Sequence, residues 1–206
     1  MRIEKLERSK HKQECVLVYL EGEAPIRVTE NELLHFGLYA GLDIDPASVV
    51  ELKKRAAQSE TRLRAVNMIS ARPLSRQELQ RRLCDKGATE QDAAAAADWL
   101  ESIGALDDLA YARTLVRHYS ENGYGAAKLR DELYRRGIAR ELWDEALAAA
   151  PEAQETAARV LAAKLRGRTP DARERKRLSD LLLRRGFSWG EVRAALNAVC
   201  TDYEED

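Results

Sequence analysis

The side chains most able to do chemistry in this 206-residue sequence are basic residues grouped just before three glycines. Gly87, Gly137 and Gly186 each follow directly on a lysine or an arginine, and further arginines stand close by. The grouped residues are Arg81, Arg82 and Lys86, then Arg135 and Arg136, then Arg184 and Arg185. Guanidinium and ammonium groups bind phosphates and carboxylates through charge-assisted hydrogen bonds. The groups therefore indicate contacts with a phosphate backbone or with an acidic protein surface.

A plainer interpretation of the same residues stays open. Cations near the C-terminal end of a helix are favoured by the helix dipole, by roughly 0.3–1 kcal/mol each. On this interpretation the basic groups only stabilise the ends of their own helices and bind nothing.

The other residue types that carry chemistry do not assemble into a site. The three histidines are isolated, and the spacing of the cysteines and histidines fits no zinc site. No nucleophile has a base and an orienting group in a recognisable motif. Asp107 and Asp108 are explained more simply as the N-cap of a helix than as metal ligands. We therefore expect no catalytic residue, no metal, no cofactor and no enzyme activity.

Gly123-Tyr-Gly-Ala-Ala-Lys128 superficially resembles a glycine-rich phosphate loop. It lacks the Gly-Lys-Ser/Thr ending, and a predicted helix precedes it where a phosphate loop has a strand. The segment is therefore predicted to be a turn between helices.

Helices must position the basic groups, because good helix formers dominate the chain and only 11 glycines and 5 prolines interrupt it. Residues 14–20 and 26–28 predict the two strands of a hairpin in a small sheet. A short helix near 30–38 and a longer one from Pro46 toward Ile69 follow. Further helices are predicted near 76–86, 90–103, 108–122, 126–136, 140–149, 152–166, 171–185 and 189–200. Capping boxes begin two of them, at Ser75 and Ser188.

The three glycines are also in register with a repeat, since they lie 50 and 49 residues apart. Leucines stand eight and four residues before each glycine, and a small or apolar residue stands ten after it. These residues are Leu79, Leu129 and Leu178, then Leu83, Leu133 and Leu182, then Ala97, Leu147 and Leu196. The spacing predicts three copies of a three-helix unit whose apolar stripes form the core.

The predicted organisation is therefore a mainly α protein with a small N-terminal extension that contains the hairpin. The boundaries are 1–60 for the extension, 61–106, 107–150 and 151–200 for the repeats, and 201–206 for an acidic tail.

The near-neutral charge of the chain, 34 basic against 35 acidic residues, conceals charged segments. Residues 61–87 carry a net +5, residues 88–110 a net −6, and residues 151–200 a net +5. Because the total is balanced, direct DNA binding is expected to be weak and secondary.

The sequence also indicates where the protein is found. No apolar stretch is long enough to span a membrane, and the N-terminus lacks a signal sequence. Three scattered cysteines fit a reducing compartment, so a cytoplasmic protein is expected.

The aromatic residues concentrate in the repeats. Trp99, Trp143 and Trp189 fall on or next to the third helices and are expected to pack in the core or between repeats. Four tyrosines crowd the second repeat, and one or two of them are expected to be exposed at a contact surface; these are Tyr111, Tyr119, Tyr124 and Tyr134.

Each of the three repeats carries a motif in register with the others. The second repeat has the most specific ones, Leu106-Asp-Asp-Leu-Ala-Tyr-Ala-Arg113, Asn122-Gly-Tyr-Gly125 and Lys128-Leu-Arg-Asp-Glu-Leu-Tyr-Arg-Arg-Gly-Ile138. The flanking repeats have Leu74-Ser-Arg-Gln-Glu-Leu79 and Arg184-Arg-Gly-Phe187. Together these motifs resemble the RecX family, the bacterial regulatory proteins of the RecA recombinase. The resemblance covers about residues 61–200, and an alanine run at 93–97 and a basic insertion at 166–176 depart from it.

The resemblance implies tandem three-helix repeats in an elongated, curved array. It also implies a monomeric regulator that binds RecA or its filament on single-stranded DNA and restrains ATP hydrolysis, strand exchange and coprotease activity in DNA repair and recombination. A direct DNA-binding helical repeat protein is the alternative. The candidate contact residues are Arg81, Arg82, Lys86, Tyr124, Lys128, Arg135, Arg136, Arg175, Lys176, Arg184 and Arg185.

Overall fold

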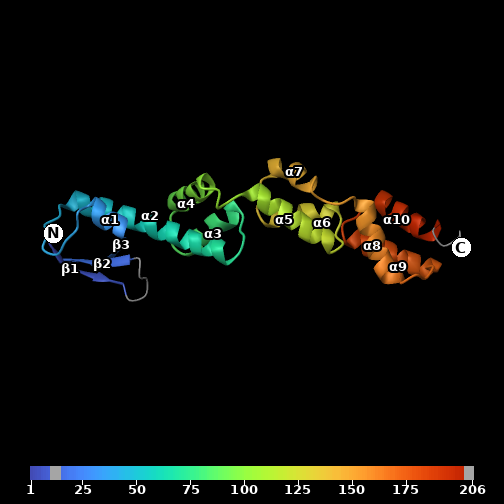
Figure 1. The fold of residues 1–206 in the computed structure, drawn as a ribbon, viewed down its shortest axis with the longest axis horizontal. Coiled ribbons are helices and arrows are strands. Elements are labelled where there is room, and N and C mark those ends of the chain that lie inside the picture. The colour runs from blue at the N-terminus through green and yellow to red at the C-terminus, as the bar shows by residue number, and fades with distance from the viewer. Residues whose placement is uncertain (10–14, 202–206) are drawn as a thin grey trace. The chain divides into compact units, whose positions relative to one another are not determined.

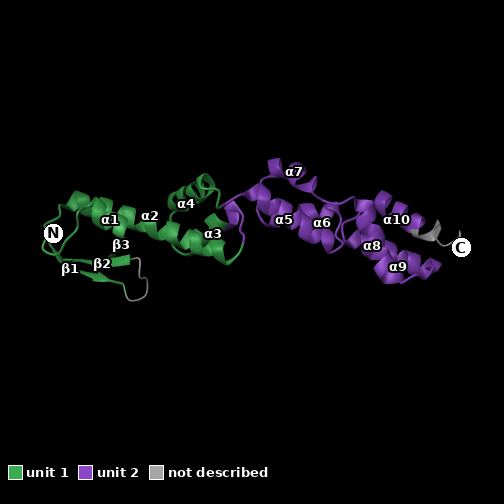
Figure 2. Cartoon of the chain, viewed as in Figure 1, with its two compact units in different colours: residues 1–72, 79–105 green, residues 73–78, 106–206 purple. Residues whose placement is uncertain are grey.

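A computed structural model describes residues 1–9 and 15–201 of the chain, so most of the predicted acidic tail, residues 202–206, lies outside the described residues. The chain is mainly helical with a small sheet near its N-terminus (Figure 1). It divides into two compact units, one of residues 1–72 with 79–105, the other of residues 73–78 with the described residues from 106 onward (Figure 2).

The sheet of the first unit has three antiparallel strands in the order β1-β2-β3. The predicted hairpin is confirmed as β2 (Cys15–Leu20) and β3 (Ile26–Thr29). The edge strand β1 (Ile3–Arg8) was not predicted, because its residues are mostly charged and show no clean alternation. It forms by antiparallel pairing with β2. At its start Ile3 is fully buried, and its backbone exchanges hydrogen bonds with Leu42 and Gly41 at 2.9 and 2.8 Å.

One long helix links the sheet to the first repeat. After the short α1 (Glu30–His35), α2 (Pro46–Ala71) begins at an Asp45 cap whose carboxylate accepts the Ser48 N–H at 2.9 Å. α2 packs against β3 and against α4 (Glu90–Ser102), while α3 (Arg76–Asp85) precedes α4. The predicted boundary between residues 60 and 61 therefore falls inside a continuous helix.

The second unit contains the second and third repeats. Its helices are α5 (Asp108–Glu121), α6 (Ala126–Arg135), α7 (Trp143–Leu147), α8 (Ala153–Leu165), α9 (Ala172–Arg184) and α10 (Trp189–Thr201). The single helix predicted near 140–149 is instead a 3₁₀ turn (Arg140–Leu142) followed by the five residues of α7. Ala139 offers no side-chain cap to begin a regular helix, and the Trp143 indole N–H bonds back to the Ile138 carbonyl at 2.9 Å.

The predicted leucine stripes form the core of the repeats. The six leucines at the two repeat positions are all buried, and α3, α6 and α9 each end two residues before a repeat glycine, as expected. Leu129 and Leu133 pack with α5 and α7, and Leu178 and Leu182 pack with α8 and α10. Within the described ranges, no helix combines the length and the apolar character needed to cross a bilayer.

Consecutive repeats meet at a contact that we call the repeat joint. In each joint, the turn that ends one middle helix reaches the start of the preceding middle helix. The carbonyl of Arg136 accepts the Ser75 hydroxyl, and the equivalent carbonyl of Arg185 accepts the Gly125 N–H at 2.8 Å. The Ala127 N–H adds a bond to the Gly186 carbonyl at 3.1 Å. The residues of both contacts lie within the second unit, and the backbone bonds of the second joint hold the third repeat on the second.

Truncation of the buried stripe tests the core. We expect Leu133→Ala to lower the free energy of unfolding by about 2–5 kcal/mol, because it leaves a cavity under a fully buried side chain. Leu34→Ala is the control, since Leu34 is 76% exposed and its loss should change stability by under about 0.5 kcal/mol. Urea unfolding followed by circular dichroism measures both, and equal midpoints for the two variants would contradict the assignment of the core.

A second pair of variants tests the repeat joint. Gly87 and Gly186 both have positive φ, +90° and +88°, so alanine costs each of them about 1–2 kcal/mol. A Cβ at Gly87 meets open space, whereas a Cβ at Gly186 would lie 2.5 Å from the Lys128 backbone nitrogen. We expect Gly186→Ala to be less stable than Gly87→Ala by roughly a further 1–3 kcal/mol, the cost of overpacking. Equal losses of stability in the two variants, measured by thermal unfolding, would mean that the joint accommodates the added Cβ at no energetic cost.

Candidate partner-binding surface

Arg185 and Tyr124 are held inside the joint between the second and third repeats. The Arg185 guanidinium donates to the carbonyls of Asn122 and Gly123 at 3.0 and 3.2 Å, and it lies 5.5 Å from the centre of the Tyr124 ring. Both side chains are half-buried. The guanidinium group and the ring therefore already make contacts within the chain, at the C-terminal end of α5.

Arg136 has a similar place in the joint between the first and second repeats. Its side chain is half-buried, with Nη1 3.8 Å from Glu78 Oε2, and its carbonyl accepts the Ser75 hydroxyl. Arg82 is likewise half-buried and has an interaction partner within the chain. These two candidate residues contribute to the fold.

Lys128 and Arg135 are paired with acids on their own helix. Lys128 Nζ lies 3.0 Å from Asp131 and 2.9 Å from Glu132, and Arg135 lies 3.2 and 3.5 Å from the same carboxylates. Burial acts to raise the pKa of Glu132, but hydrogen bonds from Lys128 and Tyr119 outweigh it and lower the pKa. Glu132 is therefore ionised at neutral pH, and these four side chains together are close to neutral.

The remaining candidates face solvent. They are exposed and have no carboxylate partner among residues 1–9 and 15–201; they are Arg81, Lys86, Arg175, Lys176 and Arg184. The backbone carbonyl of Lys86 accepts the Arg64 guanidinium at 2.7 Å, while the Lys86 side chain is exposed. Among the candidates selected from the sequence, these five are the cations that the fold leaves available to an anionic partner.

Exposure separates the aromatic residues. Trp143 packs in the second-repeat core as predicted, and Trp99 is half-buried with the Arg62 guanidinium 5.6 Å from its ring centre. The expectation for Trp189 was wrong, because this side chain is 63% exposed. Phe187, two residues earlier, fills the core of the third repeat in its place.

The exposed tyrosine of the second repeat is Tyr134, at 72%, while the other three are half-buried. Arg130, which the sequence analysis did not select, lies one helical turn earlier on the same face of α6 and is also exposed. Tyrosine and arginine are enriched among the residues that dominate binding energy at protein interfaces. The sequence signal that could have identified Arg130 and Tyr134 is their i, i+4 spacing beside the leucine stripe of the same helix.

The basic insertion of the third repeat lengthens α9 at its start. α9 has 13 residues where α3 and α6 have 10, and Asp171 caps it by accepting the Glu174 N–H at 2.7 Å. Beside this added turn lies a surface pocket of about 240 Å³ between α9 and α10. Arg175, Lys176, Trp189 and Arg193 line it, with Val192 and Leu196 among the apolar residues.

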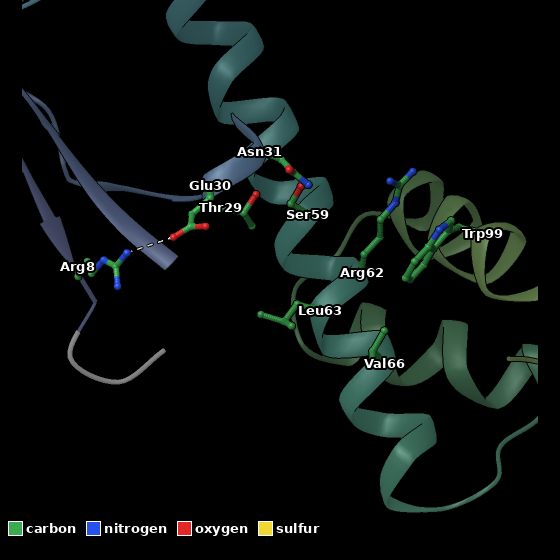
Figure 3. A pocket seen from close by; sticks show the side chains of 9 residues that line it. All are labelled: Arg8, Thr29, Glu30, Asn31, Ser59, Arg62, Leu63, Val66 and Trp99. Carbon is green, nitrogen blue, oxygen red and sulfur yellow. Dashed lines mark hydrogen bonds and ion pairs between the residues drawn. The ribbon is translucent and has the colours of Figure 1, made fainter. Parts of the chain in front are cut away.

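A wider groove of about 780 Å³ lies in the first unit (Figure 3). Leu63 and Val66 of α2 extend into it, and Arg62 points toward Trp99 at one end. At the other end Arg8 and Glu30 form an ion pair of 3.3 Å. The lining is thus mixed, and half of its basic charge is already neutralised.

The residues weighed for other chemistry have structural partners. Asp107 caps α5 by accepting the Ala110 N–H at 2.9 Å, and Asp108 accepts the Arg76 N–H at 2.7 Å. The Gly125 N–H, which a phosphate loop would direct at its ligand, bonds to the Arg185 carbonyl. In the part of the chain that the structure describes, no three histidine, cysteine or acidic residues gather as metal ligands would.

Comparison with known proteins matches all three repeats. Models of the first, second and third three-helix domains of RecX match residues 62–100, 107–147 and 152–196. The "Regulatory protein RecX" of Stenotrophomonas maltophilia is 35% identical over 75% of this chain and 93% of its own length. That of Chromohalobacter salexigens is 35% identical over 64% of this chain and 88% of its own.

Solved structures share the fold. A crystal structure of regulatory protein RecX aligns with a TM-score of 0.71 over 98% of both chains, at 24% identity. The crystal structure of RecX from Lactobacillus salivarius aligns with a TM-score of 0.63, covering 69% of this chain and 96% of its own, at 21% identity. The family models and the curated relatives together establish that this chain belongs to the RecX family of regulatory proteins.

Proposed function

We propose that the chain binds the RecA recombinase, or the filament that RecA forms on single-stranded DNA, and restrains its ATPase, strand-exchange and coprotease activities. The match of three consecutive repeats to the three RecX domain models carries this proposal. The protein would act in the cytoplasm, as a monomer and without a cofactor.

The available cations support binding at several points. Arg81 and Lys86 belong to the first repeat, and Arg175, Lys176 and Arg184 belong to the third. Contacts carried on one chain raise each other's effective concentration, so individually weak ion pairs add to a stable complex. Charge complementarity of this kind favours rapid association and selects the partner.

The repeat joints support the same proposal. Backbone hydrogen bonds fix the second repeat on the third, so the exposed face of α6 and that of α9 keep a set spacing. Binding then costs less conformational entropy than it would for surfaces on a flexible linker. Arg130 and Tyr134 offer an anchor on α6 that does not depend on net charge.

The direct test measures ATP hydrolysis by RecA on single-stranded DNA while this protein is titrated. We expect turnover to fall with increasing protein and to level off at saturation. Unchanged turnover at excess protein, with RecA and DNA at working concentrations, would exclude the proposed function.

Charge reversal at the available cations makes the test specific. We expect Arg81→Glu combined with Arg184→Glu to raise the concentration for half-inhibition by about tenfold or more, since two like-charge repulsions replace two attractions. The matched control is Lys54→Glu with Lys164→Glu, two exposed lysines on α2 and α8. Equal effects of the two double variants would assign the inhibition to net charge alone. Arg136 is unsuitable for this purpose, because a carboxylate there would face Glu78 in the repeat joint.

A further inference from the structure

Trp189 stands at the start of α10 with most of its surface in solvent. It is 63% exposed, although the neighbouring Phe187 and Val192 are buried in the core of the third repeat. An exposed indole costs free energy in water, and it presents an aromatic face to any ligand that reaches it.

Three cations line the same pocket as this indole, between α9 and α10. Arg175 and Lys176 come from the first turns of α9, and Arg193 comes from α10, one turn after Trp189. All three are exposed, and none has a carboxylate partner in the described part of the chain.

The acidic groups of the same helices do not cancel this charge. Glu174 is paired with Arg168 at 3.5 Å, and Glu191 accepts the Ser188 N–H at 2.6 Å in the predicted capping box. Asp180 is exposed on α9 and has no cation within ion-pair distance among the described residues. The pocket therefore combines an exposed aromatic ring with three uncompensated positive charges.

We infer that this pocket is a binding site for single-stranded nucleic acid, in which one base stacks on Trp189 while Arg175, Lys176 and Arg193 contact the flanking phosphates. Proteins that bind single strands without sequence preference combine a cationic surface with aromatic platforms in this way. The site goes beyond the proposed function, since it contacts nucleic acid directly and does not require RecA.

A single strand fits these residues better than the other anionic partners. A duplex keeps its bases stacked inside, so its phosphates would contact the cations but no base would stack on the indole. An acidic protein segment would meet the same cations, but it offers no unstacked base to cover the exposed indole.

Binding of a fluorescein-labelled oligothymidylate to the full-length protein, followed by anisotropy, tests the stacking. We expect Trp189→Ala to weaken binding roughly ten- to a hundredfold, the range found when one stacking aromatic is removed. Trp189→Phe should recover most of the affinity, because a phenyl ring still stacks. Tyr39→Ala, which removes an aromatic of 60% exposure in the first unit, should leave binding unchanged.

Salt dependence separates the phosphate contacts from the stacking. We expect Arg175→Ala and Arg193→Ala each to reduce the slope of log affinity against log salt by about 0.7, the value for one phosphate contact on a single strand. Trp189→Ala should keep the wild-type slope. Lys164→Ala, an exposed lysine on α8 outside the pocket, is the matched control.

Three outcomes would overturn the inference. The first is that Trp189→Ala binds oligothymidylate with the affinity of the wild type. The second is that the wild type binds a duplex of the same length as tightly as the single strand. The third is that Trp189→Ala loses RecA inhibition while neither the wild type nor any variant binds naked single strands. The last would assign the pocket to an acidic protein partner. Because the assay contains no RecA, failure of this site and failure of the proposed function are distinguishable.

Discussion

The carbonyl oxygen before each repeat glycine is the group on which the arrangement of the repeats depends. A helix leaves its last carbonyls without partners, and burying one unpaired costs free energy. Here Arg64 satisfies the Lys86 carbonyl, the Ser75 hydroxyl satisfies that of Arg136, and the Gly125 N–H satisfies that of Arg185. In the second and third cases the donor stands at the start of the preceding middle helix. In the third case both repeats lie in the second unit, so satisfying the carbonyl also fixes one repeat on the other.

This constraint explains why equivalent basic residues have different roles. Arg136 and Arg185 precede glycines whose turns lie against another repeat, so their guanidinium groups are drawn into the joint. Lys86 precedes a glycine with open space around it, and its ammonium group stays in solvent. The fold therefore uses the guanidinium groups of Arg136 and Arg185 and leaves the Lys86 side chain exposed, although the three residues stand at equivalent positions.

Local signals in the sequence were sufficient for most of the fold. Leucine spacing, caps such as Asp45 and Asp107, and the glycine stops depend on neighbours within a few residues. They located the helices correctly except near 140–149, where a 3₁₀ turn precedes the short α7. Strand β1 escaped because its residues are mostly charged and show no clean alternation, so that only its pairing with β2 identifies it. The exposure of Trp189 escaped because Phe187, two residues earlier, fills the core in its place, and spacing alone does not decide which of two nearby aromatics is buried.

Which candidate residues are exposed also depends on contacts between residues distant in sequence. The residue types at a few repeat positions indicate where those contacts occur. Twelve and ten residues before the repeat glycines, the first repeat has Ser75 and Gln77 and the second has Gly125 and Ala127, all uncharged. A turn of the next repeat approaches these positions so closely that a Cβ on Gly125 would lie 2.6 Å from the Gly186 carbonyl oxygen. The third repeat has a glutamate and Lys176 there instead. Long charged side chains do not fit beneath such a turn, so the residue types themselves distinguish a position that packs on a neighbouring repeat from one that faces solvent.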